Sequence, residues 1–496
     1  MSAVTAQLAG LQVVIPLLGA IVAAFIRRGP LAWAWAALIT TATPVIAFAL
    51  LFKVWTSGTI SYHLGGWPPP IGIEYRVDLL NAFVLVLLGV ISTVMIPFAR
   101  RSIAYEIDGD RQAWFYTAYL LCLTGLLGIT ITGDAFNAFV FLEISSLATY
   151  VLIATGRDRR ALLASYQYLV LGTIGATFYV IGIGLLYLVT GSLNFADIAA
   201  RLASANDAFP RPVMAALAFL FVGISLKLAL FPLHVWLPNA YAYAPSFATA
   251  FLAATATKVA IYLFIRIALS GFGVAIDNGD LPITGVLYPL SIAAMFIASI
   301  LAVYEQNLKR MLAYSSIAQI GYITLGIALA NQAGLTGAIV HLFNHALIKG
   351  ALFLALGAVL YRCGSVRLRD LGGIGRAMPL TFAAFVVAGL SLIGVPGTAG
   401  FISKYYLIVG AYREWWPLTF LIVASSLIGL VYIGRVIEVA YFRPTSETAA
   451  RAKDPPLMML APILTLALAS IYFGIDTQLT VGVASRIAET LLGGLK

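Results

Sequence analysis

Long apolar stretches are the feature that most constrains how this chain can fold. A helix needs about 20 mostly apolar residues to cross a bilayer, and only 10% of these residues are charged, against about 25% in a soluble domain. We therefore predict an all-α integral membrane protein with about fourteen transmembrane helices. The predicted spans lie near residues 3–26, 31–54, 79–99, 113–132, 135–155, 162–190, 213–243, 245–269, 285–303, 311–330, 334–361, 379–411, 418–441 and 457–474.

These stretches form one membrane domain, 1–496, with a regular internal order. Three helices within 1–112 precede two five-helix blocks, 113–269 and 285–441, and a last helix spans 457–474. One helix in each block carries proline and glycine in its middle, which predicts an interrupted helix. Five is odd, so consecutive blocks would have opposite orientation, as two inverted repeats require.

The distribution of arginine and lysine predicts the orientation of the chain. The net charge is +10, but basic residues concentrate in the short loops on one side of the predicted spans. An excess of this kind marks the cytoplasmic side. We therefore expect a multi-pass protein of the cell inner membrane with both termini outside, and no nucleic-acid partner.

Several charged residues fall inside predicted spans. Each costs roughly 2.5–3.5 kcal/mol at the bilayer centre if it faces lipid. They must therefore face one another, water or backbone carbonyls inside the bundle. These residues are Glu143, Lys227, Lys258, Lys349, Lys404, Arg435 and Glu438.

Two of these lysines lie beside predicted helix breaks. Lys227 precedes Pro232 and Pro238, and Lys404 follows a Gly-Val-Pro-Gly segment. A charge beside an interrupted helix is typical of transporters, although a plain proline kink is the alternative for Lys227. Glu143 needs a cationic partner, whether its role is structural or linked to proton movement.

Lys258 lies too deep in its span to reach the surface easily. Because burial disfavours a charge, this lysine could release and regain a proton, and a permanently paired lysine is the alternative. His341 and His345 are four residues apart and share a helix face with Lys349. They could form a proton relay, hydrogen-bonded core histidines or a metal pair, but no third metal ligand is evident in the sequence.

Arg435 and Glu438 are three residues apart, so we expect them to form a structural ion pair. His234, between the two prolines, could be accessory.

Four segments of the sequence stand out as motifs: the span around Glu143, FPLHVWLP within 227–245, NLKRMLAYSSIAQIGY at 307–322, and HLFNHALIKGALFLALG at 341–357. Together they resemble one known family, the antiporter-like subunits of respiratory complex I and of Mrp-type cation/proton antiporters. The resemblance covers residues 70 to 441. It implies fourteen helices with two inverted five-helix repeats.

The resemblance also implies a role for each residue that matches a family motif. Glu143 matches the pairing carboxylate and Lys227 the lysine that it modulates. Lys258 matches the central relay lysine, His341 and His345 the histidine connection, and Lys404 the last ionisable group. The lysine at 404 and the short end of the chain favour the D-type subunit of an Mrp-type Na⁺/H⁺ antiporter.

The histidine segment also resembles subunits of membrane-bound hydrogenase-type complexes, so a redox host such as a complex I-like NADH dehydrogenase remains the alternative. In either host we expect membrane subunits as partners and protons as cargo, with Na⁺ exchanged if the host is an antiporter. We expect no cofactor or metal in this chain. A non-transporting scaffold and a membrane quinone oxidoreductase are the two competing functions. A transporter subunit fits the buried charges better than an enzyme does.

Overall fold

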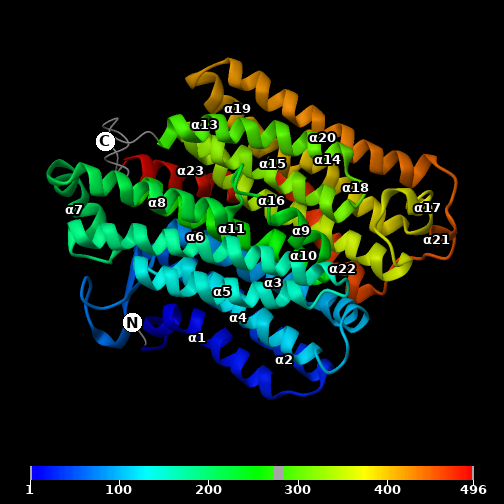
Figure 1. The fold of residues 1–496 in the computed structure, drawn as a ribbon, viewed down its shortest axis with the longest axis horizontal. Helices are drawn as coiled ribbons and strands as arrows, with labels where there is room; N and C mark the ends of the chain where they lie inside the picture. Colours follow the sequence, from blue (N-terminus) through cyan, green and yellow to red (C-terminus); the bar gives the residue numbers. More distant parts are fainter. Residues whose placement is uncertain (1–2, 272–282, 494–496) are drawn as a thin grey trace.

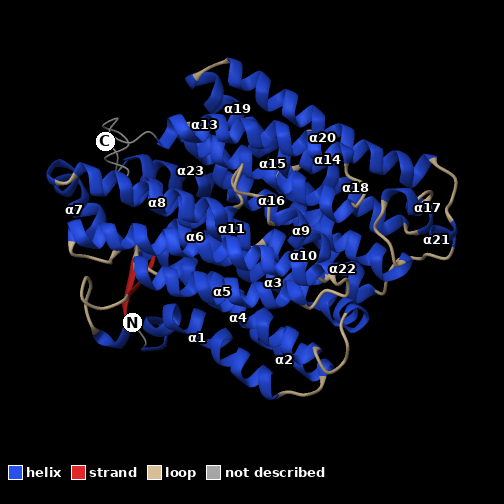
Figure 2. Ribbon diagram, in the orientation of Figure 1, coloured by secondary structure: helices blue, strands red, loops and turns tan. Residues whose placement is uncertain are grey.

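The computed structural model describes residues 3–271 and 283–493. It is a bundle of long helices that run side by side, and the two ends of the chain lie at the same end of the bundle (Figure 1). Helices make up almost all of it, as Figure 2 shows. Large apolar side chains such as Phe52 and Leu188, which are 71% and 73% exposed, cover its outer faces. This is the surface that hydrocarbon as solvent permits.

The N-terminal part contains three helices and one hairpin. The helices are α1 (Ala3–Phe25), α2 (Gly29–Ser57) and α3 (Leu79–Glu106). Between α2 and α3, strands β1 (Ile60–His63) and β2 (Glu74–Val77) pair antiparallel around the short η1 (Leu64–Gly66), with Ile60 opposite Val77. The hairpin lies in the stretch 55–77 between two predicted spans.

The first predicted block contains more elements than its spans suggest. They are α4 (Gln112–Ile131), α5 (Ala135–Ala154), α6 (Arg160–Thr190), α7 (Phe195–Ala208), α8 (Pro210–Leu228), α9 (Leu237–Tyr243), α10 (Ser246–Ala254), α11 (Ala256–Ile265) and η2 (Arg266–Gly271). Helices α6 and α8 approach closely: a Cβ at Gly223 would lie 2.7 Å from the amide nitrogen of Tyr179. Small residues allow such contacts between membrane helices.

The second predicted block and the C-terminal part also contain more elements than their spans suggest. They contain α13 (Ile283–Ala293), η3 (Ala294–Ala298), α14 (Ser299–Tyr304), α15 (Leu308–Ala328), α16 (Gln332–Cys363), η4 (Leu368–Asp370), α17 (Ile374–Ala377), α18 (Pro379–Ile393), α19 (Ala399–Glu414), α20 (Pro417–Phe442), α21 (Glu447–Ala450), α22 (Leu457–Ile475) and α23 (Gln478–Gly493). Helices α15 and α16 run through the middle of the bundle (Figure 1).

Thirteen helices of the described residues are long and apolar enough to cross a membrane. The fourteenth predicted span, 379–411, is divided into α18 and α19, which are 15 and 16 residues long. The predicted break in 213–243 is present as well, between α8 and α9. Both interrupted helices are therefore confirmed, whereas the inverted relation of the two blocks stays a prediction.

Candidate membrane proton path

Glu143 and Lys227 meet in the first block. Glu143 Oε1 lies 3.7 Å from Lys227 Nζ, and the side chain of Lys227 is only 5% exposed while that of Glu143 is 26% exposed. The lysine also donates a hydrogen bond of 2.6 Å to Ser146 Oγ, one turn after Glu143 on α5. Helix α5 thus supplies both an anionic ion-pair partner and a neutral hydrogen-bond acceptor to one buried ammonium.

Hydrogen bonds bridge the break after Lys227. Ala229 ends α8 in the left-handed conformation, with φ at 61°. Leu230 N then donates to Ser225 O, and the Trp236 indole donates to Leu226 O at 2.9 Å. Lys227 lies in the last turn of α8, where the helix dipole favours a cation.

A small cavity with a mostly apolar lining lies between Lys227 and Thr257, the residue before Lys258. It has a volume of about 30 Å³, and its lining includes Ser146, Thr149 and Thr257. A cavity needs about 10–15 Å³ to hold one water molecule. The cavity therefore has room for a hydrogen-bonded link between the Lys227 ammonium and the residue next to Lys258.

Lys258 lies at a second helix irregularity, which the sequence did not predict. The expected continuous span 245–269 is interrupted at Thr255, whose φ and ψ are −124° and −58°. Lys258 Nζ donates to Ala253 O, on the other side of this irregularity, and to Thr257 Oγ1 at 3.3 Å. Within the described part of the chain, the fully buried ammonium therefore has only neutral oxygens as hydrogen-bond partners.

The two histidines of α16 lie in the middle of the bundle with their rings stacked, 6.2 Å apart. His341 contacts Ser403 Oγ at 2.8 Å and Gln319 Oε1 at 2.9 Å through its two ring nitrogens. Neither ring nitrogen of His345 has a hydrogen-bond partner among the described residues, although Lys258 and Lys349 lie close enough for their charges to act on it.

Within the described residues, no group of three His, Cys, Asp or Glu side chains gathers as a metal site. Lys349 is also enclosed, and its ammonium donates to Ser315 Oγ at 2.6 Å and to Leu312 O at 2.9 Å.

Lys404 lies at the far end of these groups, beside the second break. Its ammonium donates to the carbonyls of Leu392 and Ile393, at 3.1 and 2.8 Å, which are the last two residues of α18. It also donates to Ser426 Oγ at 2.9 Å and faces the ring of Tyr322, 4.7 Å from the centroid. The lysine thus pairs with the backbone groups that the interrupted helix leaves free.

The accessory residues differ from expectation. The predicted ion pair between Arg435 and Glu438 is wrong. Glu438 accepts from Arg443 at 3.0 Å, and the Arg435 guanidinium donates to the carbonyl of Val303. Arginine side chains are long enough to find partners beyond their own helix face. His234 is 7% exposed and stacks on Phe231 within the first break.

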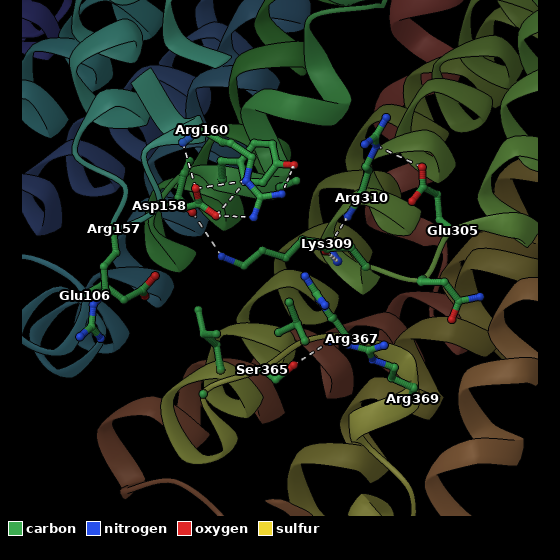
Figure 3. A pocket seen from close by; sticks show the side chains of 18 of the residues that line it. Glu106, Arg157, Asp158, Arg160, Glu305, Lys309, Arg310, Ser365, Arg367 and Arg369 are labelled. Atoms are coloured by element: carbon green, nitrogen blue, oxygen red, sulfur yellow. Dashed lines mark hydrogen bonds and ion pairs between the residues drawn. The ribbon is translucent and has the colours of Figure 1, made fainter. Parts of the chain in front are cut away.

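A larger pocket of about 680 Å³ opens at the arginine-rich end of the bundle. Figure 3 shows that its labelled side chains come from several separate segments, with Lys309 extending across the pocket. Two of its carboxylates are already paired: Asp158 with Arg160 at 2.6 Å, and Glu305 with Arg310 at 3.1 Å. None of the predicted site residues is among the described residues that line it.

Comparison with known proteins identifies the family of this chain. Residues 132–429 match the model of a family described as NADH:quinone oxidoreductase/Mrp antiporter, transmembrane. The chain belongs to this family. Subunit N of an NADH-quinone oxidoreductase from Desulforudis audaxviator is 41% identical over 96% of this chain and 97% of its own length. The D-type subunit of a Na⁺/H⁺ antiporter from Alkalihalophilus pseudofirmus is 30% identical over 90% and 89%.

Solved structures of antiporter-like chains share the whole fold. A chain of an archaeal membrane-bound sulfane sulfur reductase superposes with a TM-score of 0.89 at 30% identity, covering 99% of each chain. A chain of the Mrp complex from Dietzia sp. DQ12-45-1b gives a TM-score of 0.89 at 26% identity, covering 99% of this chain and 98% of its own. The expected antiporter-like membrane fold is therefore confirmed.

The residues that sequence reasoning missed are mostly neutral ones. Ser146, Gln319, Ser403 and Ser426 hydrogen-bond to the predicted groups from neighbouring helices. Serine is common in membrane helices, where it usually bonds to its own backbone. One sequence feature could have pointed to some of these serines. Serine occurs as an adjacent pair in three membrane helices, at Ser145-Ser146, Ser315-Ser316 and Ser425-Ser426.

Proposed function

We propose that this chain carries protons through the membrane interior, along a path from Glu143 and Lys227 through Lys258 and the histidines to Lys404. The observation that carries the proposal is the row of buried ionisable side chains between two interrupted helices. Bringing so many titratable groups into the interior opposes folding. A scaffold would gain nothing from them, because apolar residues of similar volume pack as well or better.

In this mechanism the distance between Glu143 and Lys227 controls proton release. Two unit charges about 4 Å apart attract by about 4 kcal/mol at an effective dielectric constant of about 20. Movement of the carboxylate away from Lys227 would remove much of this attraction, and the ammonium would then pass its proton through the cavity toward Thr257 and Lys258. Glu143 is more exposed than Lys227, which gives the carboxylate room to move.

The host is proposed to be a multisubunit complex of the inner membrane, with other membrane subunits beside this chain. An Mrp-type Na⁺/H⁺ antiporter, in which the chain would be the D-type subunit, fits the lysine at 404 and the superposition on the Mrp complex. A redox-driven complex is the second candidate. The 41% identity to an NADH-quinone oxidoreductase subunit and the superposition on the sulfane sulfur reductase favour it.

Orientation and internal symmetry belong to the same proposal. The arginine-rich end of the bundle would face the cytoplasm, which places both termini outside. The blocks 113–269 and 285–441 would be inverted repeats, with Lys227 and Lys404 as the lysines beside their breaks.

The test is proton flux in vesicles that contain the assembled host complex. A sodium gradient should drive proton movement if the host is an antiporter, whereas an electron donor and quinone should drive it if the host is a redox complex. Lys404→Ala should reduce the flux in either case, with Arg443→Ala as a control outside the path. Undiminished flux in the Lys404 variant, at equal amounts of assembled complex, would contradict the proposed path.

A further inference from the structure

The ammonium of Lys404 lacks a carboxylate partner within the described chain. Among the ion pairs formed by the described residues none involves Lys404, whereas Lys227 pairs with Glu143. Besides its hydrogen bonds to two carbonyls and to Ser426, the Lys404 ammonium faces the Tyr322 ring, 4.7 Å from the ring centroid. An aromatic face attracts a cation through its quadrupole, and the attraction is stronger where water is excluded. Tyr322 is 1% exposed and Lys404 5%, so this contact is enclosed.

Hydrogen bonds hold the hydroxyl end of Tyr322. Its hydroxyl donates to Ser425 Oγ at 2.9 Å and lies 3.1 Å from Ser426 Oγ. Ser425 in turn donates to the carbonyl of Met295, and Ser426 accepts from Lys404. One helix, α20, therefore holds the ring through its hydroxyl and the ammonium through a serine. Both partners of the aromatic contact therefore lie against α20.

Tyr322 also touches the middle of the path. Its ring centroid lies 5.8 Å from that of His341, and Gln319, three residues earlier on the same face of α15, contacts His341 Nε2 at 2.9 Å. The ring thus contacts both a histidine and the last lysine of the path. A group in this place can decide where the ammonium rests relative to His341.

We propose that Tyr322 is a positioning residue that holds the Lys404 ammonium against its ring face, at the place where the first block uses a carboxylate. The proposal rests on the proton path described above. Because the ring is neutral, it stabilises the ammonium without forming an ion pair, and the lysine keeps a fixed position while its proton can still leave. Among the described residues, the titratable group besides Tyr322 that interacts with Lys404 is His341 of α16. Of the other helices that pack on α19, α18 and α22 carry no charged residue, and the Arg435 and Glu438 side chains of α20 bind Val303 O and Arg443.

Tyr322→Phe and Tyr322→Leu separate the ring face from the hydroxyl. In the assembled complex the Phe variant should keep flux within about twofold, whereas the Leu variant should lose about tenfold or more, as expected for an enclosed cation–π contact. The alkaline limb of the pH profile should move to lower pH in the Leu variant, because the ammonium form has lost a stabilising contact. A Phe variant as impaired as the Leu variant would overturn the proposal, since the hydroxyl would then be the essential group.

Fluorinated phenylalanines at position 322 provide a test that does not depend on a change of shape. Each added fluorine weakens the negative face of the ring, so flux should fall stepwise from phenylalanine to its trifluoro form. Equal flux across the series would overturn the proposal even if the Leu variant fails to assemble. Lys404→Ala, measured in parallel, tests the path itself: if that variant transports normally, the proposed function fails at this position whatever Tyr322 does.

Discussion

The two ends of the proposed path hold their lysines in different ways. Lys227 pairs with a partly exposed carboxylate, whereas Lys404 is enclosed by two carbonyls, a serine hydroxyl and an aromatic face. An ion pair depends strongly on separation, while a set of neutral acceptors changes little when one of them moves. The first end is therefore suited to respond to a change elsewhere in a complex, and the second to accept whatever proton reaches it.

Lys258, between the two ends, should be the position where substitution costs most. Lys258→Ala should lower flux by about a hundredfold or more, because no parallel carrier among the described residues links the cavity to the histidines. Lys258→Arg keeps a positive charge but does not release its proton in a protein, so it should fail as well. Flux in vesicles, normalised to assembled complex, measures both. Rescue by arginine would show that Lys258 supplies only a structural charge.

Glu143→Gln tests the charged end of the comparison. Glutamine keeps the shape but removes the negative charge, so flux should fall by about tenfold or more while assembly is retained. Glu438→Gln is the matched control, because Glu438 also lies on a membrane helix but pairs with Arg443 at the surface. If both glutamine variants transported normally, the ion pair at Lys227 would have no part in the mechanism.

Ser426→Asp would give Lys404 a carboxylate partner, as Lys227 has in Glu143. The new carboxylate should hold Lys404 as an ammonium too firmly for rapid release, and flux should fall by about threefold to tenfold. Ser426→Asn introduces a side chain of the same size as aspartate but without charge, so it should reduce flux less. Equal flux in the two variants would mean that Lys404 tolerates a carboxylate partner. The difference between the partners of Lys227 and Lys404 would then have no functional meaning.

The smallest effect on transport is expected at a charge pair outside the path. Burial raises the pKa of the Asp78 carboxyl, but the charge and hydrogen bonds of Arg266 more than offset this and hold it below its usual value. The pair thus stabilises the fold at neutral pH and loses its contribution only as pH falls below about 4. Asp78→Asn should lower the thermal unfolding midpoint but leave flux per assembled complex within about twofold. A large loss of flux would show that Asp78 and Arg266 also take part in proton transport.

Much of the architecture follows from apolar runs and their interruptions. Both broken helices were predictable, because proline and glycine stand together in the middle of their spans, whereas Pro44 and Pro97 lie within helices that continue. The break at Thr255 was not, since neither proline nor glycine marks it. Helices α7 and α23 were missed because they are short and too polar for a search based on spans.

The partners of the buried charges could be predicted only in part. The row of buried groups itself was predictable because lysine and histidine are costly inside a membrane. Which serine or carbonyl each group contacts depends on how different helices pack, and spacing along one helix says nothing about that. The prediction of an ion pair between Arg435 and Glu438 was wrong for this reason. Their spacing allows a contact, but Glu438 pairs with Arg443 and Arg435 donates to the Val303 carbonyl.

Helix α16 runs for 32 residues without interruption, about 48 Å at 1.5 Å per residue. His341, His345 and Lys349 therefore lie on one continuous helix, and the distances between them stay constant when α16 shifts or tilts as a unit. The lysines before and after them stand on half-helices that end within the bundle. The intervals that flank α16 can therefore lengthen or shorten, as can the distance between Glu143 and Lys227. In the proposed path we expect the slow steps of proton passage at these variable intervals and not along α16.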